Sequence, residues 1–203
     1  MTAAILIVVA YLLGSLSAAI IVCRAIGAPD PRTVGSGNPG ATNVLRVAGK
    51  KAAAATLLGD TLKGLLPVLL GRALGLPIDA LAAVGLAAFL GHLYPVFFQF
   101  QGGKGVATLI GALLGIAWPL GAFFVVVWFV VARLSRISSL AAITAAVLTP
   151  LYAWLRGYPA LTVLAIMAMV VLLVWRHRSN IRKLIDGTES RIGGKSSADP
   201  QSE

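Results

Sequence analysis

Long uncharged apolar segments alternate with short polar segments along most of this chain. Residues 3–23 carry no charged side chain over 21 positions, and as a helix they would be roughly 31 Å long, close to the hydrocarbon thickness of a bilayer. Gly, Pro or charged residues of the kind that end helices separate the later segments. Those apolar segments are 52–71, 79–98, 106–117, 119–132, 138–155 and 159–175. The pattern predicts an all-α integral membrane protein with about seven transmembrane helices.

Segment 106–117 is too short to cross a bilayer without tilt or thinning, because twelve helical residues rise only about 18 Å. It forms either a short helix shielded by its neighbours or the start of one kinked helix that runs to Arg133, so counts of five or six spans stay open. A cleaved signal peptide is the alternative for 3–23. Such a peptide begins with positive charge, whereas the first charged residue here is Arg24.

The basic residues are distributed unevenly between the two sides that seven spans would create. One side, with loops 24–51, 99–105, 133–137 and the chain after 175, holds fourteen of the 17 Lys and Arg residues, and the other side holds only Arg72 and Arg156. By the positive-inside rule the first side is cytoplasmic. We therefore expect the N-terminus outside the cell and the C-terminus in the cytoplasm.

Composition supports the same class of protein. Apolar residues make up 58% and charged residues 12% of 203 positions, with a net charge of +10, which is unlike a soluble domain, a disordered chain or a soluble nucleic-acid binder. The single Cys excludes an intrachain disulfide and a cysteine metal cluster. We expect one membrane domain over 1–191, and a disordered cytoplasmic tail over 192–203, which is polar and rich in small residues.

The first cytoplasmic loop is rich in groups that bind anions. It reads GSGNPGATNVLR over 35–46. A Gly-rich turn that enters a helix can point several backbone N–H groups at one anion, and an arginine adds a bidentate fork for phosphate. The donors that we expect to contact an anion are Ser36, Gly37, Asn38, Thr42, Asn43 and Arg46, although a flexible loop would have a similar composition.

Two further cytoplasmic segments have a comparable character. Gly102, Gly103 and Lys104 precede an apolar helix and would present amides and an ammonium group at its N-terminus, although the Walker spacing is absent. The basic cluster that starts at Arg176 suits anionic lipid headgroups, but this does not explain His177 and Asn180, which share one helix face. Arg133 either reaches the same site or merely ends a helix.

Three ionisable residues lie inside apolar segments, where charge is costly and is usually paired or functional. Asp60 and Lys63 are one helical turn apart, and a mutual ion pair is slightly favoured over a substrate role. His92 is expected to be a hydrogen-bonded structural residue rather than a catalyst.

These motifs resemble those of the bacterial acyl-phosphate:glycerol-3-phosphate acyltransferases, the PlsY family. The resemblance extends from the first span to about Glu189 and rests on three motifs in order. They are GSGNPGATNxxR at 35–46, GHxYP followed by GGKGVAT within 91–108, and HxxNI followed by GxE within 177–189. Lys183 stands where many members have arginine, which keeps the charge but loses the planar fork.

The resemblance implies transfer of a fatty acyl group from acyl phosphate to the 1-hydroxyl of sn-glycerol 3-phosphate, giving lysophosphatidic acid and phosphate. It implies a multi-pass enzyme of the bacterial inner membrane that has a cytoplasmic active site and uses no acyl-CoA directly. We expect no metal, cofactor, nucleic acid or protein partner, only the two substrates and membrane lipids. The substrate-binding residues are then Ser36, Gly37, Asn38, Thr42, Asn43, Arg46, Gly102, Gly103, Lys104, Arg133, His177 and Asn180.

The catalytic residues in this interpretation are Lys104, His177 and Ser36. The His-x-x-x-x-Asp pair of acyl-CoA-dependent enzymes is missing, since Phe97 and Arg182 occupy the fifth positions after His92 and His177. An acyl phosphate is already activated, so positioning and charge neutralisation are the main requirements. We expect direct attack by the hydroxyl, with either His177 or a substrate phosphate as the base.

Two other classes of protein fit parts of the pattern. A transporter of an organic phosphate would use the same loops, but it would need polar residues along a path through several spans, and only Asp60 and Lys63 clearly qualify. A membrane anchor would leave the donor-rich loops unexplained.

Overall fold

The computed structural model describes residues 1–193, which are α-helical apart from one short 3₁₀ helix and the connecting loops. This confirms the all-α prediction. The helices in order are α1 (Thr2–Gly14), α2 (Ala18–Ala25), α3 (Ala41–Ala73), α4 (Ile78–Leu93), the 3₁₀ helix η1 (Val96–Phe98), α5 (Val106–Ile116), α6 (Trp118–Ser135), α7 (Ser138–Leu155), α8 (Ala160–Arg176) and α9 (Arg178–Ile185).

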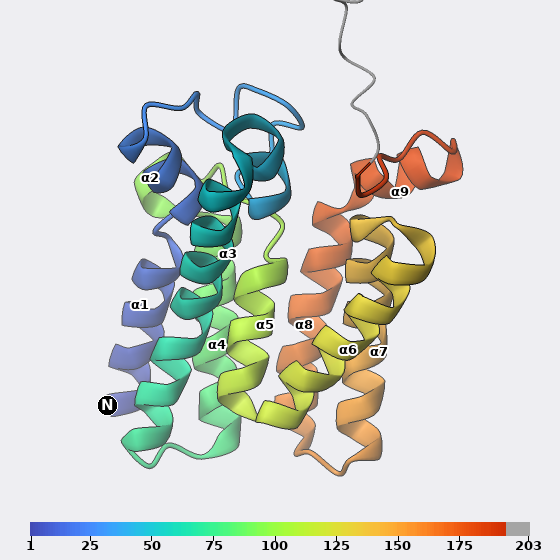
Figure 1. The fold of residues 1–203 in the computed structure, drawn as a ribbon. Coiled ribbons are helices and arrows are strands. Elements are labelled where there is room, and N and C mark those ends of the chain that lie inside the picture. Colours follow the sequence, from blue (N-terminus) through green and yellow to red (C-terminus); the bar gives the residue numbers. More distant parts are fainter. Residues whose placement is uncertain (194–203) are drawn as a thin grey trace, which may run out of the picture.

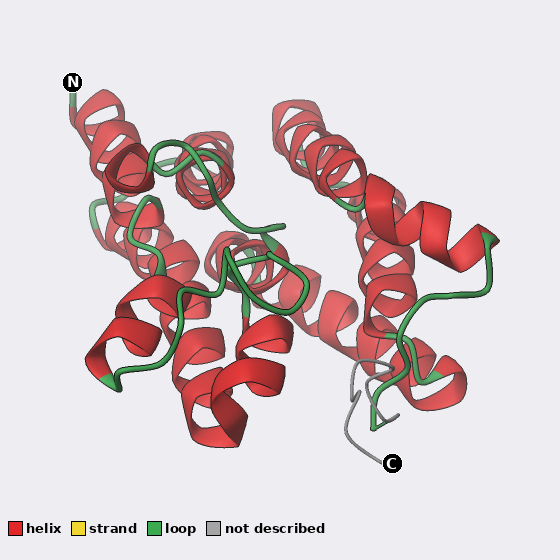
Figure 2. Cartoon of the chain, turned by 90° about the horizontal axis from the view of Figure 1, so that it is seen from above, coloured by secondary structure: helices red, strands yellow, loops and turns green. Residues whose placement is uncertain are grey.

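The long helices run roughly along one direction, and both α2 and α9 lie at the end of the bundle opposite the end at which the chain starts, α2 on one side and α9 on the other (Figure 1). Seen from that end, the loops between helices gather over the bundle (Figure 2). Helix α4 is central, because it packs against α1, α3, α5 and α8, while α6 and α7 pack against each other. The arrangement brings the predicted cytoplasmic segments to the same end.

Four helical segments are long and apolar enough to cross a membrane: α3, α4 with η1, α6 and α7. Two bent pairs, α1 with α2 and α8 with α9, raise the number to six if each pair is one span. Helix α5 has 11 residues and rises only about 16 Å. By length and composition, residues 1–193 therefore contain four to six spans, and the seventh predicted span is the short α5.

The first apolar segment is not one helix, as predicted for 3–23, but two helices bent by 41°. Ser17 between them has an extended backbone (φ −82°, ψ 100°). The carbonyl of Leu16, in the break, accepts a hydrogen bond of 2.7 Å from Lys63 Nζ on α3. A break in a membrane helix needs such a partner, because an unpaired carbonyl is costly in an apolar environment.

Two other predicted boundaries are wrong. Residues 41–51, expected in a loop, are the start of α3, and the helix is interrupted at Gly49, whose φ of 81° favours glycine. Helix α4 ends at Leu93 rather than at 98, since Pro95 disfavours helical geometry at Tyr94 (φ −130°, ψ 66°). In consequence the loop that carries Lys104 begins earlier than predicted.

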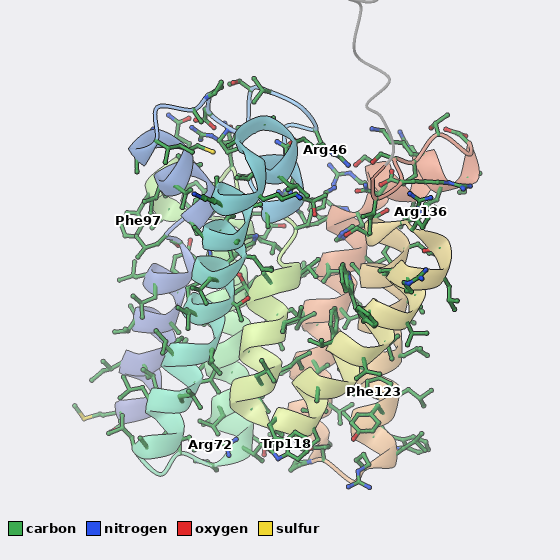
Figure 3. All side chains as sticks on the ribbon, viewed as in Figure 1. Arg46, Arg72, Phe97, Trp118, Phe123 and Arg136 are labelled. Carbon is green, nitrogen blue, oxygen red and sulfur yellow. The ribbon has the colours of Figure 1, made fainter. Side chains whose placement is uncertain are left out.

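The open choice for 106–132 is resolved in favour of two helices. Ala117, between α5 and α6, is extended (φ −159°, ψ 122°), and α6 turns back along the bundle after α5 (Figure 1). At the end of the bundle away from α9 (Figure 3), Arg72 Nη2 in the last turn of α3 donates to the carbonyls of Gly115 (2.8 Å) and Ile116 (2.5 Å) at the end of α5. These hydrogen bonds satisfy carbonyls that a helix C-terminus leaves free.

Small residues let the helices around α4 and α5 approach closely. A Cβ atom added at Gly91 would collide with the Tyr11 carbonyl of α1, and one added at Gly111 would collide with the Thr61 carbonyl of α3. Such contact allows dispersion forces to hold helices together where lipid removes the hydrophobic drive. The glycines at these positions therefore allow close packing, which keeps the short α5 inside the bundle.

Candidate active site

A cavity of about 550 Å³ lies between α3, α5, α6, α7 and α9 and the loops at the end of the bundle that carries α9. Figure 3 shows Arg46 and Arg136 at this end and Arg72 and Trp118 at the opposite end. Eight of the twelve predicted site residues line the cavity, although they come from distant parts of the sequence. They are Ser36, Asn38, Thr42, Asn43, Arg46, Lys104, His177 and Asn180.

Lys104 is the partly buried cation of this cavity. Its Nζ donates a hydrogen bond to Asn180 Oδ1 on α9. Burial lowers the pKa of Lys104 to about 8, because desolvation disfavours the ammonium form, although the Glu189 carboxylate partly opposes this. At neutral pH the side chain is therefore still mostly charged, and its charge is poorly hydrated.

The backbone that carries Lys104 is held from two sides. Arg176 donates through its Nη2 to the Gly102 carbonyl and through its Nε to the Gly103 carbonyl (3.1 Å). The Gly103 N–H donates to the His92 carbonyl (3.2 Å), and a side chain at Gly102 or Gly103 would collide with residues 92–93. Neither glycine lines the cavity. This geometry argues against the expected binding of an anion by the Gly103 amide, and both glycines let the loop pack closely.

Asn43 lines the cavity, but its polar groups are occupied. Its Oδ1 accepts from the Ser36 N–H (2.8 Å), and its Nδ2 donates to the carbonyls of Pro31 (2.8 Å) and Val34 (3.0 Å). The residue is 1% exposed. This geometry argues against the predicted direct contact with a ligand and indicates that Asn43 shapes the loop that presents Ser36.

His177 follows α8 and is buried at 3% exposure. Its Nδ1 lies 2.8 Å from the Leu173 carbonyl, which can only accept, so Nδ1 carries the proton and Nε2 is the acceptor of the neutral ring. Burial lowers the pKa of His177 to about 4. The ring is therefore neutral at pH 7 and is suited to accept a hydrogen bond from a hydroxyl group.

A network around Glu189 links α9 to α7, and sequence reasoning assigned it no role. Glu189 Oε1 accepts from Asn180 Nδ2 and from Ser139 Oγ, both at 2.8 Å. The neighbouring Ser190 accepts from Arg46 Nη2 at 2.7 Å. The sequence feature that could have identified Glu189 is its position as an acidic residue among many basic ones, at the end of the motif within 177–189.

The remaining predicted residues lie outside the cavity lining. Gly37 has a φ of 68° in the loop, a left-handed value that suits a turn glycine. Arg133 is exposed in the last turn of α6, which favours the alternative of a helix end, and its binding role stays a prediction. Of the predicted tail, Ile192 is anchored by its N–H to the Arg136 carbonyl (2.6 Å), whereas residues 194–203 lie outside the described residues.

The three ionisable residues within the apolar segments meet beside the cavity. Lys63 Nζ lies 2.8 Å from Asp60 Oδ1, which confirms the predicted ion pair. His92 Nδ1 lies 3.6 Å from the same oxygen, and within residues 1–193 it has no hydrogen-bond partner, so the expected hydrogen bond is not made. Asp60 and His92 both line the cavity. The buried ion pair therefore borders the cavity through Asp60.

Part of the cavity wall is apolar. Leu57 of α3, Ile110 of α5 and Val125 and Trp128 of α6 are among these side chains, and Leu57 and Val125 are also exposed on the outer surface of the helices. The sequence did not single them out, because α6 is apolar on nearly every face. A cavity with cations at one end and hydrocarbon along its side suits a phosphorylated lipid-like molecule.

The fold and the cavity together define a helical integral membrane protein with a phosphate-suited site at one end of its bundle. A family model described as "Glycerol-3-phosphate acyltransferase" matches residues 4–187. The chain belongs to this family, as the three sequence motifs predicted.

Known relatives and solved structures agree with this assignment. Proteins named glycerol-3-phosphate acyltransferase from Methylococcus capsulatus and Thioalkalivibrio sulfidiphilus are 56% and 57% identical, over 94% and 95% of this chain and 96% and 95% of their own lengths. A crystal structure of PlsY (YgiH), described as an integral membrane glycerol 3-phosphate acyltransferase in its glycerol 3-phosphate form, superposes with a TM-score of 0.90 at 41% identity. It covers 95% of this chain and 96% of that one. The likeness confirms an all-helical integral membrane fold.

The Asp60–Lys63 pair provides a stability prediction. Asp60→Asn leaves the Lys63 ammonium buried without its carboxylate, and breaking a buried pair in this way costs about 3–5 kcal/mol. We expect a large drop in the thermal unfolding temperature of the purified protein in detergent, with partial recovery in Asp60→Asn/Lys63→Met. The control is Asp30→Asn, which breaks a partly exposed pair with Arg32 and should cost at most about 1 kcal/mol. Equal losses in the two single variants would contradict the assignment.

Proposed function

We propose that this protein transfers a fatty acyl group from acyl phosphate to the 1-hydroxyl of sn-glycerol 3-phosphate, releasing lysophosphatidic acid and phosphate. The observation that carries the proposal is the convergence of Ser36, Arg46, Lys104, His177 and Asn180 on one cavity with an apolar side. Both proposed substrates carry phosphate, and one carries a hydrocarbon chain. The solved PlsY structures are described as glycerol 3-phosphate and lysophosphatidic acid forms, which supports the acceptor and the product.

The proposed topology has seven bundle segments, with α5 as a short one held between its neighbours. The N-terminus lies outside the cell, and the end that carries α9 lies in the cytoplasm. The charge asymmetry of the loops supports this orientation. The cavity then opens at the cytoplasmic face of a bacterial inner membrane, where soluble glycerol 3-phosphate has access.

The basic and amide groups divide between the two phosphates. Arg46, Ser36 and Asn38 come from the first loop and the start of α3, and with Asn180 they would hold the phosphate of the acceptor. Lys104 stands beside Asn180 and would stabilise the phosphate that leaves the donor. Thr42 adds a hydroxyl to the first group, while Asn43, Gly102 and Gly103 act by shaping the loops. No cofactor, metal or protein partner is needed in this scheme.

The transfer is a direct attack by the glycerol hydroxyl on the acyl carbon. The bond from the hydroxyl oxygen to the acyl carbon forms, the bond from that carbon to the phosphate oxygen breaks, and the hydroxyl proton ends on the departing phosphate. His177 is too weak a base to keep this proton at pH 7, given a pKa of about 4. In the proposed mechanism its Nε2 orients the hydroxyl and a substrate phosphate takes the proton, and the low pKa of His177 supports this choice between the two bases considered from the sequence.

The direct test is an assay with defined substrates. Purified protein in detergent, given palmitoyl phosphate and glycerol 3-phosphate, should release inorganic phosphate and form lysophosphatidic acid in equal amounts. A parallel reaction with palmitoyl-CoA should give no product. Product from palmitoyl-CoA alone would show that the donor is misassigned, and phosphate release without acylated product would show hydrolysis instead of transfer.

Replacing Lys104 tests the proposed role of its ammonium group. Loss of one preorganised charge-stabilising group costs about 10²–10³ in turnover, so Lys104→Ala should lower kcat by that factor. Thermal unfolding should show that the variant is folded. Lys51→Ala, on the exposed part of α3, is the control and should keep normal turnover. A Lys104→Ala rate within a factor of about three of wild type would refute the role.

The pH dependence follows from the lowered pKa of Lys104. The ammonium form is needed, and with a pKa of about 8 it is lost as the pH rises through this value. Activity should therefore fall about tenfold per pH unit above pH 8–9. Lys104→Arg keeps its charge to higher pH, so whatever its absolute rate, its alkaline fall should move up by at least one pH unit. An unchanged alkaline limb would mean that another group titrates.

A further inference from the structure

A second, smaller depression of about 470 Å³ lies at the junction between α8 and α9. Its lining consists of four basic side chains and one serine: Arg176, Arg178, Ser179, Arg182 and Lys183. Lys183 also lines the large cavity. The depression is therefore next to the candidate active site but is separate from it.

The charge of this depression is not balanced by the protein. Within residues 1–193, none of its basic side chains forms an ion pair with a carboxylate. Arg176 is engaged with the Lys104 loop, and Arg178 stacks over Trp175 at 4.5 Å, but Arg182 and Lys183 donate no side-chain hydrogen bond to a described residue. Several N–H donors are thus free for an anion.

The depression also lies where a membrane helix ends. The apolar α8 stops at Arg176, and α9 bends away from it by 57°, lying across the end of the bundle (Figure 1). Trp175 is 49% exposed and Ile185 is 80% exposed. Exposed tryptophan beside basic residues is typical of the boundary between hydrocarbon and headgroups, so a ligand here meets lipid headgroups before it meets bulk water.

We propose that this depression binds the phosphate-bearing headgroup of an anionic membrane lipid. The guanidinium groups of Arg178 and Arg182 and the ammonium of Lys183 contact the headgroup phosphate, while Trp175 and Ile185 lie against the first part of the acyl chains. Bound lipid fixes the orientation of α9, which carries Asn180 into the active site. The assignment rests on the membrane boundary and the charge cluster, and it stands whether or not the proposed acyl transfer is correct.

Lipid titration followed by native mass spectrometry tests this site. Each basic residue near a membrane surface contributes a factor of about five to lipid affinity. The double variant Arg178→Gln/Arg182→Gln should therefore bind phosphatidylglycerol roughly 25-fold more weakly than wild type. Wild type should bind phosphatidylcholine much more weakly than phosphatidylglycerol. Ser179→Glu, which puts a negative charge in the depression, is a second variant and should show the same loss.

The matched control removes two charges elsewhere on the same end of the protein. Lys50→Gln/Lys51→Gln affects exposed residues of α3 and should bind phosphatidylglycerol within about threefold of wild type, because it removes the same charge but leaves the groups that contact the headgroup in place. An equal loss in this control, or no loss in both depression variants, would overturn the proposal. Displacement of the lipid by millimolar inorganic phosphate would also overturn it, since the depression would then be a site for the free anion.

Discussion

The position of Lys104 depends on the hydrogen bonds that fasten its loop to two helices. Lys104 lies in an irregular segment and has no helix of its own to place it. Arg176, at the end of α8, donates to the carbonyls of Gly102 and Gly103, and the His92 carbonyl of α4 accepts from the Gly103 N–H. The same guanidinium repels a second cation, and burial removes water, so the clamp that places the ammonium also helps to lower its pKa. Placement and electrostatic activation of Lys104 thus have one structural origin.

The apolar pattern predicted an all-helical membrane protein and the order of its apolar segments, because each segment must satisfy its backbone hydrogen bonds within lipid. It failed at boundaries that depend on contacts distant in sequence. The break at Ser15–Ser17 is stabilised by Lys63, 47 residues away from Leu16, and no local signal announces it. The early start of α3 at Ala41 was hidden because polar residues (Thr42, Asn43 and Arg46) and Gly49 interrupt the apolar pattern of its first turns. The end of α4 was within reach, since Pro95 alone disfavours a helix through Tyr94.

The residue types of the site could be predicted from the sequence. Which of their hydrogen-bond donors are free to bind a ligand could not. Glycine, asparagine and arginine near one face indicated anion binding, and eight of the twelve residues line the cavity. Whether a donor is free depends on the loop conformation. The side-chain amide of Asn43 is hydrogen-bonded to Ser36, Pro31 and Val34, and the Gly103 N–H donates to the His92 carbonyl. Composition cannot distinguish a group that binds a ligand from one that holds the loop. Glu189 was overlooked for the related reason that an acid has no evident place in an anion site.

Glu189 has a physical role that follows from the burial of Lys104. Burial and the neighbouring cations Arg46, Arg176 and Lys183 lower the pKa of the Lys104 ammonium, and the Glu189 carboxylate is the group that raises it. Glu189 does so through space and not by direct contact, because Asn180 stands between them, accepting from Lys104 and donating to Glu189. A direct Lys104–Glu189 pair would neutralise the ammonium and leave little attraction for a phosphate. The intervening amide keeps the cation charged while leaving its field available to a ligand, which is what an anion site at a membrane surface requires.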